Sequence, residues 1–214
     1  MNDMSRIEIN RDAVGLEQFC ATVRIKTGER FYLPVPNRSD LEHLVTTKKQ
    51  LREAAVLVPL VERSQGTMVI LTTRTANMSS HAGQIALPGG KIDAGDEGPV
   101  EAAMREAFEE IGLQQKFISP FAQLDEYITN TGYRVLPVLA RIDPECTLTL
   151  NRDEVDDVFE VPLGFLMHPA NHQLVSRLWQ GQMRTYYAMP WKDHYIWGVT
   201  AGIFRNLYQA VYTT

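Results

Sequence analysis

Cysteine is scarce in this sequence of 214 residues, and the two cysteines that it has, Cys20 and Cys146, lie far apart. Such a pair excludes a disulfide-rich scaffold and offers no cysteine cluster for a metal ion, so we expect two reduced thiols in a cytoplasmic protein. The sequence also lacks any run near the roughly 20 apolar residues that a membrane-spanning helix requires. Its first ten residues, MNDMSRIEIN, lack the apolar core of a secretory signal.

A net positive charge is absent as well. With a formal net charge of −5, the chain has no general basic field that would attract nucleic acid or an acidic membrane. An anionic small molecule would therefore need a local cationic patch or a bridging metal ion. The 44% of hydrophobic and 22% of charged residues are ordinary for a globular protein, and the length suits one domain with an appendage.

Residues 87–113 form the most informative stretch, in which a glycine-containing loop leads into a helix. Gly89 and Gly90 permit tight backbone geometry. Pro99 suits the first position of a helix and Gly112 suits the position after its end, so the sequence predicts a helix between them. The apolar side chains that recur at helical spacing, and that we expect to pack on a core, are Val100, Ala103, Met104, Ala107 and Ile111.

Three glutamates share one face of this helix. Glu106, Glu109 and Glu110 are spaced i, i+3 and i+4, so their carboxylates crowd together and repel one another. Hard divalent cations such as Mg²⁺ prefer oxygen ligands of this kind, which makes the helix a candidate metal site. Arg105 can pair with Glu101 or Glu109 one turn away. The alternative is a solvated acidic face, and the glycines in front of the helix weaken that interpretation.

The chain is expected to divide into two parts. Residues 1–50 are predicted to form an N-terminal extension that supplies packing or dimer contacts, with one helix at 12–23 and a second helix at 40–53. No residue of the extension carries recognisable chemistry. Residues 51–214 are predicted to form the main domain.

The main domain mixes strands with helices. Its strands are expected at 54–61, 68–74, 84–87, 117–129, 133–142, 158–161, 184–188 and 194–197. Besides the central helix, helical segments are expected at 162–167 and 198–212. Pro137 suggests an edge strand or a bulge. This order of elements predicts an α+β fold, an α/β/α sandwich around a mixed β-sheet.

Residues 105–113, REAFEEIGL, resemble the second half of the Nudix box, G-x5-E-x7-R-E-U-x-E-E-x-G-U, in which U is an aliphatic residue. The first half departs from this pattern because the loop is one residue longer. Counting from Gly90 places Asp96 at the position of the early glutamate, whereas counting back from Arg105 places Glu97 there. The resemblance implies the Nudix hydrolase fold and cleavage of a diphosphate with the help of a divalent cation.

A longer resemblance, over about residues 50–210, is to the coenzyme A pyrophosphatase branch of this family. The segment at 70–90, ILTTRTANMSSHAGQIALPGG, is similar to the signature before the box in that branch, and the C-terminal half is likewise similar. The arginine of the signature that precedes His81 is absent, and Ser79 and Ser80 stand in its place. The resemblance implies cleavage of coenzyme A or an acyl derivative to 3′,5′-ADP and a 4′-phosphopantetheine.

The resemblance also assigns roles to individual residues. Mg²⁺ or Mn²⁺ would be bound by carboxylates and one backbone carbonyl, those of Glu106, Glu109, Glu110 and Gly89. Arg105 would orient a carboxylate. Glu106 is the first candidate for the base that takes the proton of water, and Glu154 is the second. Arg74 and His81 are the candidate substrate contacts, although Glu154 and Arg74 also fit a solvated surface and His81 also fits a residue that orders its loop.

Two other functions stay open. The same chemistry could act on another nucleoside diphosphate derivative, such as ADP-ribose, a dinucleotide or a nucleoside triphosphate, and the replaced arginine keeps this alternative alive because its cation would suit a phosphate. The other is a catalytically silent nucleotide-binding module, against which the intact glutamates argue. We expect a small-molecule partner rather than nucleic acid or a membrane, and we leave a homodimer open.

Overall fold

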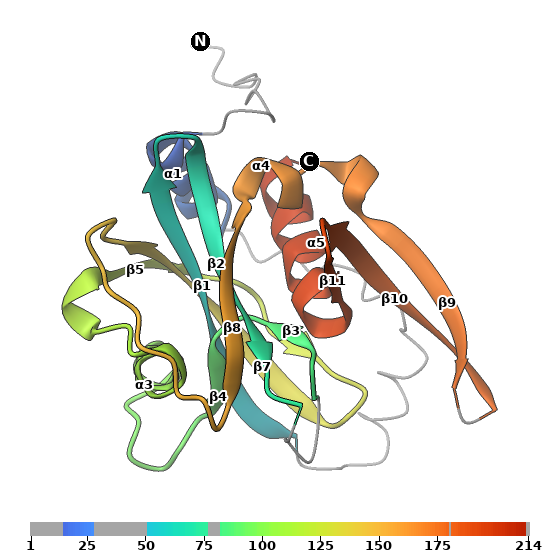
Figure 1. Ribbon diagram of the computed structural model, residues 1–214. Coiled ribbons are helices and arrows are strands. Elements are labelled where there is room, and N and C mark those ends of the chain that lie inside the picture. The colour runs from blue at the N-terminus through green and yellow to red at the C-terminus, as the bar shows by residue number, and fades with distance from the viewer. Residues whose placement is uncertain (1–14, 28–50, 77–81, 180, 213–214) are drawn as a thin grey trace, which may run out of the picture.

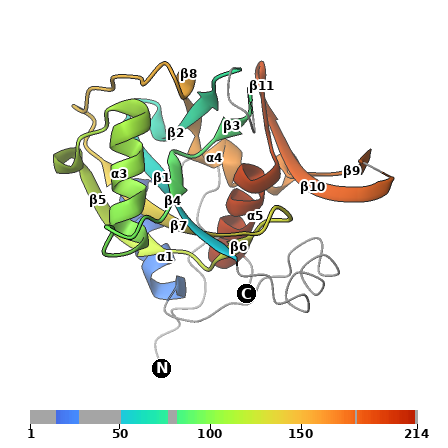
Figure 2. The ribbon, with the colours of Figure 1, turned by 90° about the horizontal axis from the view of Figure 1, so that it is seen from below.

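The structure is a computed structural model (Figure 1). It describes residues 15–27, 51–76, 82–179 and 181–212. At its centre is an eight-stranded β-sheet. The helix α3 (Pro99–Ile111) covers one face of this sheet and the helix α5 (Gly198–Tyr212) covers the other, as Figure 1 and Figure 2 show. The predicted sandwich of helices around a mixed sheet is therefore confirmed.

The main sheet is built around β1. In chain order its strands are β1 (Arg52–Arg63), β2 (Gly66–Arg74), β3 (Ile85–Ala86), β4 (Gly89–Lys91), β5 (Ile118–Gln123), β6 (Tyr127–Ile128), β7 (Tyr133–Ile142) and β8 (Val155–Pro162). The order of hydrogen-bonded strands across the sheet is β3-β2-β1-β7-β5. In addition, β4 pairs with β1, β6 pairs with β7 and β8 pairs with β2. Only β1 and β7 among these pairs run parallel. A parallel pair needs a long crossover, and this one contains α3, which places the helix over the sheet.

The remaining elements surround α5. A three-stranded sheet of order β11-β10-β9 packs against it. The elements are α1 (Leu16–Thr27), α4 (Leu163–Leu166), β9 (Gln173–Trp179), β10 (Gln182–Trp191) and β11 (His194–Trp197), with short 3₁₀ turns at Gln115–Phe117 and Pro169–Asn171. The helix α1 packs against α5 and β5. None of the helices that the structure describes is long and apolar enough to cross a membrane.

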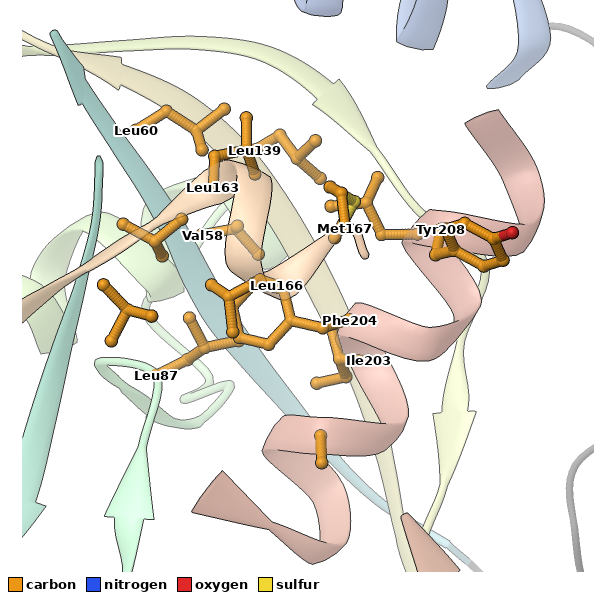
Figure 3. Close-up of a cluster of buried hydrophobic side chains, with 14 of the residues drawn as sticks. Val58, Leu60, Leu87, Leu139, Leu163, Leu166, Met167, Ile203, Phe204 and Tyr208 are labelled. Carbon is orange, nitrogen blue, oxygen red and sulfur yellow. The ribbon is translucent and has the colours of Figure 1, made fainter. Parts of the chain in front are cut away.

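The strand β1 supplies both cores because its apolar run is nearly continuous and successive side chains point to opposite faces. Ala55 and Leu57 face the core under α3. Val58 and Leu60 face the core under α5, where Figure 3 shows them in one cluster with Phe204. Two separately packed faces thus hold the sheet between the two long helices.

The elements bounded by strong local signals were predicted best. Both α3 and α5 begin and end at the predicted residues, and Gly112 ends α3 in the left-handed conformation, with φ 67°. Most predicted strands are present with bounds that differ by a few residues, but the single strand predicted at 117–129 is divided into β5 and β6. The strands β4 and β9 were not predicted. The helix predicted at 12–23 lies at Leu16–Thr27, and residues 12–14 are outside the described residues.

The helix predicted at 40–53 is wrong at its end, because Arg52 and Glu53 begin β1. Its residues 40–50 lie outside the described residues. The parallel ladder with β7, which starts with Arg52 opposite Tyr133, overrides the local helical pattern.

Of the two alternatives predicted for Pro137, an edge strand is wrong, because β7 lies between β1 and β5. An irregularity in the β5–β7 ladder does occur nearby, but it lies between Pro120 and Ala122 of β5. The carbonyl of Pro137 accepts a hydrogen bond from Leu124, just beyond the last ladder pair of β5. Pairing resumes with β6 only at Val135. Proline is tolerated in this interior strand because it stands where the neighbouring ladder is interrupted.

The buried face of α3 agrees with the predicted one except at its edges, because Ala103, Ala107 and Ile111 are buried and Met104 packs against the same core. Val100 was predicted to pack on the core but is 39% exposed. Ala102 and Glu110 are buried instead, beside Ala103 and Ala107. Spacing located the side of the helix that meets the sheet but not how far burial extends around it, and this matters here because burial reaches one of the three glutamates.

Candidate active site

The candidate site lies where β1 and β2 diverge. These strands pair with each other from the hairpin to Leu60 opposite Val69, and further along β1 pairs with β4 while β2 pairs with β3. Gly89 and Gly90 therefore enter the sheet beside β1, and Arg74 ends β2. The helix α3 packs on β1 and β4, as Figure 2 shows, and places its glutamates at this opening.

Arg105 joins the loop in front of α3 to two of the glutamates. Its guanidinium makes a bidentate ion pair with Asp96, in which both nitrogen–oxygen distances are 3.0 Å, and it donates to the carbonyl of Lys91 at 3.0 Å. Its Nη1 donates to Glu106 at 3.0 Å and to Glu109 at 2.9 Å. The hydrogen bonds between Asp96 and Arg105 lower the pKa of the Asp96 carboxyl and raise the pKa of the Arg105 guanidinium. Arg105 is therefore an anchored cation that orients both glutamates.

The contacts of Arg105 decide between the two candidates for the early carboxylate of the box. Asp96 holds Arg105, and the backbone N–H of Glu97 instead donates to the carboxylate of Glu101 at 2.6 Å. Glu101 is thereby engaged at the start of α3, where a negative charge is favourable. Of the two partners predicted for Arg105 on the helix, the structure shows Glu109.

Glu110 is the buried member of the three glutamates, with 1% of its surface exposed. Its carboxylate accepts hydrogen bonds from Arg74 Nη1 and from the backbone N–H of Gly89, each at 3.2 Å. Burial raises the pKa of this carboxyl to about 7 against the attraction of Arg74, and the charges of Glu106 and Glu154 add to the rise. Arg74, a predicted substrate contact, thus lies within the site, and its Nε is buried with no hydrogen-bond partner among the described residues.

Glu106 depends on the glycine that faces it. A Cβ atom at Gly90 would lie 2.5 Å from the carboxylate of Glu106, so a side chain there would displace it. Burial raises the pKa of Glu106, Arg105 opposes this shift, and repulsion by Glu109 adds to it. The side chain of Glu109 is half exposed. The three carboxylates therefore range from buried to open along one face of the helix.

The acidic loop before β8 brings Glu154 to the same place. The backbone N–H of Asn151 donates to the carbonyl of Glu110 at 2.9 Å, and that of Thr75 donates to the carbonyl of Glu154 at 3.0 Å. The Glu154 carboxylate accepts from the side-chain amide of Asn151 at 3.2 Å, and its charge contributes to the raised pKa values of Glu106 and Glu110. Asn151 was not among the predicted site residues. Its place at the start of a tight loop is the signal that could have suggested it, because asparagine side chains often hydrogen-bond to a following turn.

One predicted site residue is not placed. His81 lies outside the described residues, as do Ser79 and Ser80. A separate hollow lies at the hairpin end of β1 and β2 and contains none of the predicted site residues. Its lining includes Glu62, Thr67, Phe165 and His168.

The donor set suits a hard divalent cation. Glu106, Glu109, Glu110 and Glu154 offer carboxylate oxygens. Burial, with repulsion between the glutamates added to it, raises the pKa values of Glu106 and Glu110, and a cation would relieve that repulsion. In this structure arginines, rather than a cation, neutralise the glutamates. Within the described ranges no three acidic, histidine or cysteine side chains gather closely enough to hold an ion. A divalent cation would therefore compete with Arg105 for Glu106 and Glu109.

Comparison with known proteins identifies a family with this pattern. The family model described as NUDIX domain matches residues 51–178, which is more than half of the chain. The Nudix hydrolase NudL of Escherichia coli (strain K12) is 36% identical over 180 residues, a match that covers 83% of this chain and 89% of NudL. NudL of Escherichia coli O7:K1 matches to the same extent.

Similar solved structures are more distant in sequence. DR0079 from Deinococcus radiodurans has a TM-score of 0.48 and 19% identity, with 76% of this chain and 88% of that chain covered. A C. elegans Ap4A hydrolase has a TM-score of 0.45 and 20% identity, with 51% of this chain and 80% of that chain covered. These likenesses are too distant to carry an argument about the site.

Proposed function

Because the chain belongs to the Nudix family, we propose that it is a metal-dependent hydrolase that cleaves the diphosphate of coenzyme A or an acyl derivative to 3′,5′-ADP and a 4′-phosphopantetheine. The arrangement around Arg105 carries the proposal: this cation holds Glu106 and Glu109 beside the buried Glu110. A merely solvated acidic face would not bury one glutamate, because an uncompensated buried charge is costly. The arrangement suits a bound cation and an anionic substrate.

We propose that Glu106, Glu109 and Glu110, together with the carbonyl of Gly89, hold Mg²⁺ or Mn²⁺. Such an ion, when bound, neutralises charge on the diphosphate and lowers the pKa of a water molecule. Arg105, anchored to the loop in front of the helix, keeps carboxylate oxygens oriented. The flexible ends of Glu106 and Glu109 are the parts that would exchange the arginine for the ion.

Between the two candidate bases, the contacts favour Glu154. Glu106 accepts a hydrogen bond from Arg105 and is also a proposed metal ligand, so its carboxylate oxygens already have partners other than a water molecule. Glu154 comes from a different segment, and no ion pair to it is found among the described residues. Arg74 stands next to the loop that carries Glu154 and is the proposed contact for a substrate phosphate.

The choice of coenzyme A rests on the sequence signature at 70–90 and on the similar C-terminal half. One observation favours a second candidate substrate class. Ser79 and Ser80 replace an arginine of that signature, and a missing cation weakens recognition of an additional phosphate. Another nucleoside diphosphate derivative, such as ADP-ribose or a dinucleotide, is therefore the second candidate.

A substrate panel tests both candidates. The protein is incubated with Mg²⁺ or Mn²⁺ and coenzyme A, acetyl-coenzyme A, ADP-ribose, a diadenosine polyphosphate or a nucleoside triphosphate, and the products are separated by chromatography. We expect 3′,5′-ADP and phosphopantetheine from coenzyme A. A large preference for ADP-ribose would overturn the coenzyme A assignment. Binding without turnover of any diphosphate would support a catalytically silent module.

A variant pair tests the proposed metal site. Glu110→Gln is expected to lower kcat at least about 100-fold, because loss of a ligand should exceed the 10- to 100-fold cost of losing an outer partner. Glu145→Gln, at an exposed glutamate away from the site, is the matched control and should keep wild-type activity. Full activity of Glu110→Gln would contradict the assignment of the metal ligands.

A further inference from the structure

Asn151 uses all four of its polar groups in one small region. Its backbone N–H donates to the carbonyl of Glu110 at 2.9 Å, and its carbonyl accepts from the N–H groups of Glu154 at 3.0 Å and Val155 at 2.9 Å. Its side-chain Oδ1 accepts from the N–H of Asp153 at 3.2 Å, and its Nδ2 donates to the carboxylate of Glu154 at 3.2 Å. This one residue therefore links the end of the helix α3 to a carboxylate in another segment.

The loop between Asn151 and Glu154 is held from both sides. On one side Thr149 and Asn151 are bound to the last residues of α3, through N–H donors to the carbonyls of Ile111 and Glu110. On the other side Thr75, just after β2, donates its N–H to the carbonyl of Glu154. These contacts fix the backbone of the loop, but they leave the side-chain torsions of Glu154 free.

The amide of Asn151 supplies the missing constraint. Among the described residues, Nδ2 of Asn151 is the hydrogen-bond donor found for the Glu154 carboxylate. An asparagine suits this place because its short side chain carries an acceptor for the loop and a donor for the carboxylate at once. Aspartate offers only the acceptor, and its charge would repel Glu154.

We propose that Asn151 is a positioning residue, whose amide holds the carboxylate of Glu154 toward the glutamates of α3 and couples its orientation to the end of that helix. The proposal rests on the proposed function, in which Glu154 takes the proton of the attacking water. Orientation of such a base is worth a large factor in rate, since a misplacement of about 1 Å can cost on the order of 100-fold.

A different explanation is that Asn151 only shapes the loop. Both explanations allow a loss of stability when Asn151 is changed, so stability alone does not separate them. The two explanations differ in whether the effect of an Asn151 substitution on kcat requires Glu154 to act as the base. A residue that acts through Glu154 has no effect on kcat once Glu154 can no longer act as a base, whereas a residue that only shapes the loop lowers kcat regardless.

A double-mutant cycle measures this dependence. Asn151→Asp keeps the size and the Oδ1 acceptor, removes the donor and adds a charge that repels Glu154. We expect kcat to fall about 10- to 100-fold with KM within about twofold. Glu154→Gln is expected to lower kcat about 100- to 10,000-fold. Adding Asn151→Asp to Glu154→Gln should change kcat by less than about twofold. Equal losses in both backgrounds would overturn the proposal, as would full activity of Glu154→Gln.

Thr75→Val is the matched control. It removes the contact of the Thr75 hydroxyl with the carbonyl of Asp153 at 3.3 Å and keeps the backbone bond to Glu154. It perturbs the same loop without touching the Glu154 carboxylate, so kcat should stay within about twofold of wild type. A loss as large as that of Asn151→Asp would mean that any disturbance of the loop lowers the rate, and would overturn the proposal.

A readout without turnover separates this proposal from the proposed function. The side-chain amide protons of Asn151 are followed by NMR in the metal-free protein. We expect a shifted, slowly exchanging proton that moves in Glu154→Gln and stays in Thr75→Val. If the wild type hydrolyses no diphosphate but this signal behaves as expected, the proposed function fails and the positioning contact stands. If the signal does not respond to Glu154→Gln, the positioning contact is wrong even in an active enzyme.

Discussion

At Gly90 the absence of a side chain makes room for the carboxylate of Glu106. A Cβ atom would lie 2.5 Å from it, but the clashing atoms are the far end of a flexible side chain rather than backbone. Gly90→Ala is therefore expected to fold and to displace Glu106, lowering kcat on the order of 100-fold. The measurement is steady-state kinetics alongside thermal unfolding.

Gly95→Ala is the control for this substitution, because Gly95 lies in the loop that follows β4 and has open space around the position of a Cβ atom. It should leave kcat and the unfolding temperature close to those of the wild type. Wild-type activity in Gly90→Ala would show that the rate does not depend on the placement of Glu106.

Burial of Glu110 makes a prediction about pH. Its pKa is raised from 4.5 to about 7 in the folded protein, so between these values the folded state binds more protons than the unfolded state. The free energy of unfolding therefore falls as pH rises from about 4.5 through 7. Urea unfolding of the wild type and of Glu110→Gln is measured in EDTA between pH 4.5 and pH 8. Over this range the free energy of unfolding of the wild type should fall by up to about 3 kcal/mol more than that of Glu110→Gln. Parallel pH profiles of the two proteins would contradict the raised pKa.

At the scale of elements, the ion pair between Asp96 and Arg105 ties the loop to α3. The Asp96 side chain is nearly buried beside the guanidinium, so Asp96→Ala leaves a partly buried cation without its bidentate partner. We expect a lower free energy of unfolding and a lower kcat than in the wild type. Denaturant unfolding and steady-state kinetics measure the two effects.

Glu97→Ala is the matched control, because Glu97 is the other candidate for the early carboxylate and makes its recorded hydrogen bond through its backbone. It should change stability by less than about 0.5 kcal/mol. If Glu97→Ala proved the more damaging of the two, the assignment of Asp96 as the anchor of Arg105 would be wrong.

Elements with strong local signals were the ones that could be predicted. Pro99 and Gly112 bound α3 because proline and glycine suit the two ends of a helix for reasons of backbone geometry. The strand β4 was read as part of a loop because Gly89 and Gly90 have no strand propensity, and only pairing with β1 makes them a strand. The parallel ladder between β1 and β7, in which Arg52 pairs with Tyr133, explains why Arg52 belongs to β1 rather than to a helix.

For the whole molecule, the two faces of the main sheet carry the stability. Phe204 is fully buried in the core under α5, as Figure 3 shows, so Phe204→Ala should cost about 3–5 kcal/mol in the free energy of unfolding. Phe108 projects from α3 and is 54% exposed, so Phe108→Ala should cost less than about 1 kcal/mol. Urea unfolding of both variants measures the difference, and equal losses would contradict the described core.

Two predictions concern the whole molecule: that the N-terminal extension supplies packing or dimer contacts, and that the protein forms a homodimer. Within the described part of the extension, Phe19 and Val23 of α1 are buried against the core under α5, so α1 serves packing. Sedimentation equilibrium of the full chain tests the dimer. A monomer at micromolar concentration would restrict the role of α1 to packing within one chain.

By itself, the sequence determined the helix with its three glutamates, the arginine before them, the glycines in front and the sandwich architecture, because capping, periodicity and order of elements are local properties. Only the tertiary structure decided that Asp96 holds Arg105, that Glu110 is buried against Arg74, and that the side-chain amide of Asn151 binds the carboxylate of Glu154. Those features arise where segments distant in the chain meet. Their geometry depends on contacts between these segments, and spacing along the chain does not specify such contacts.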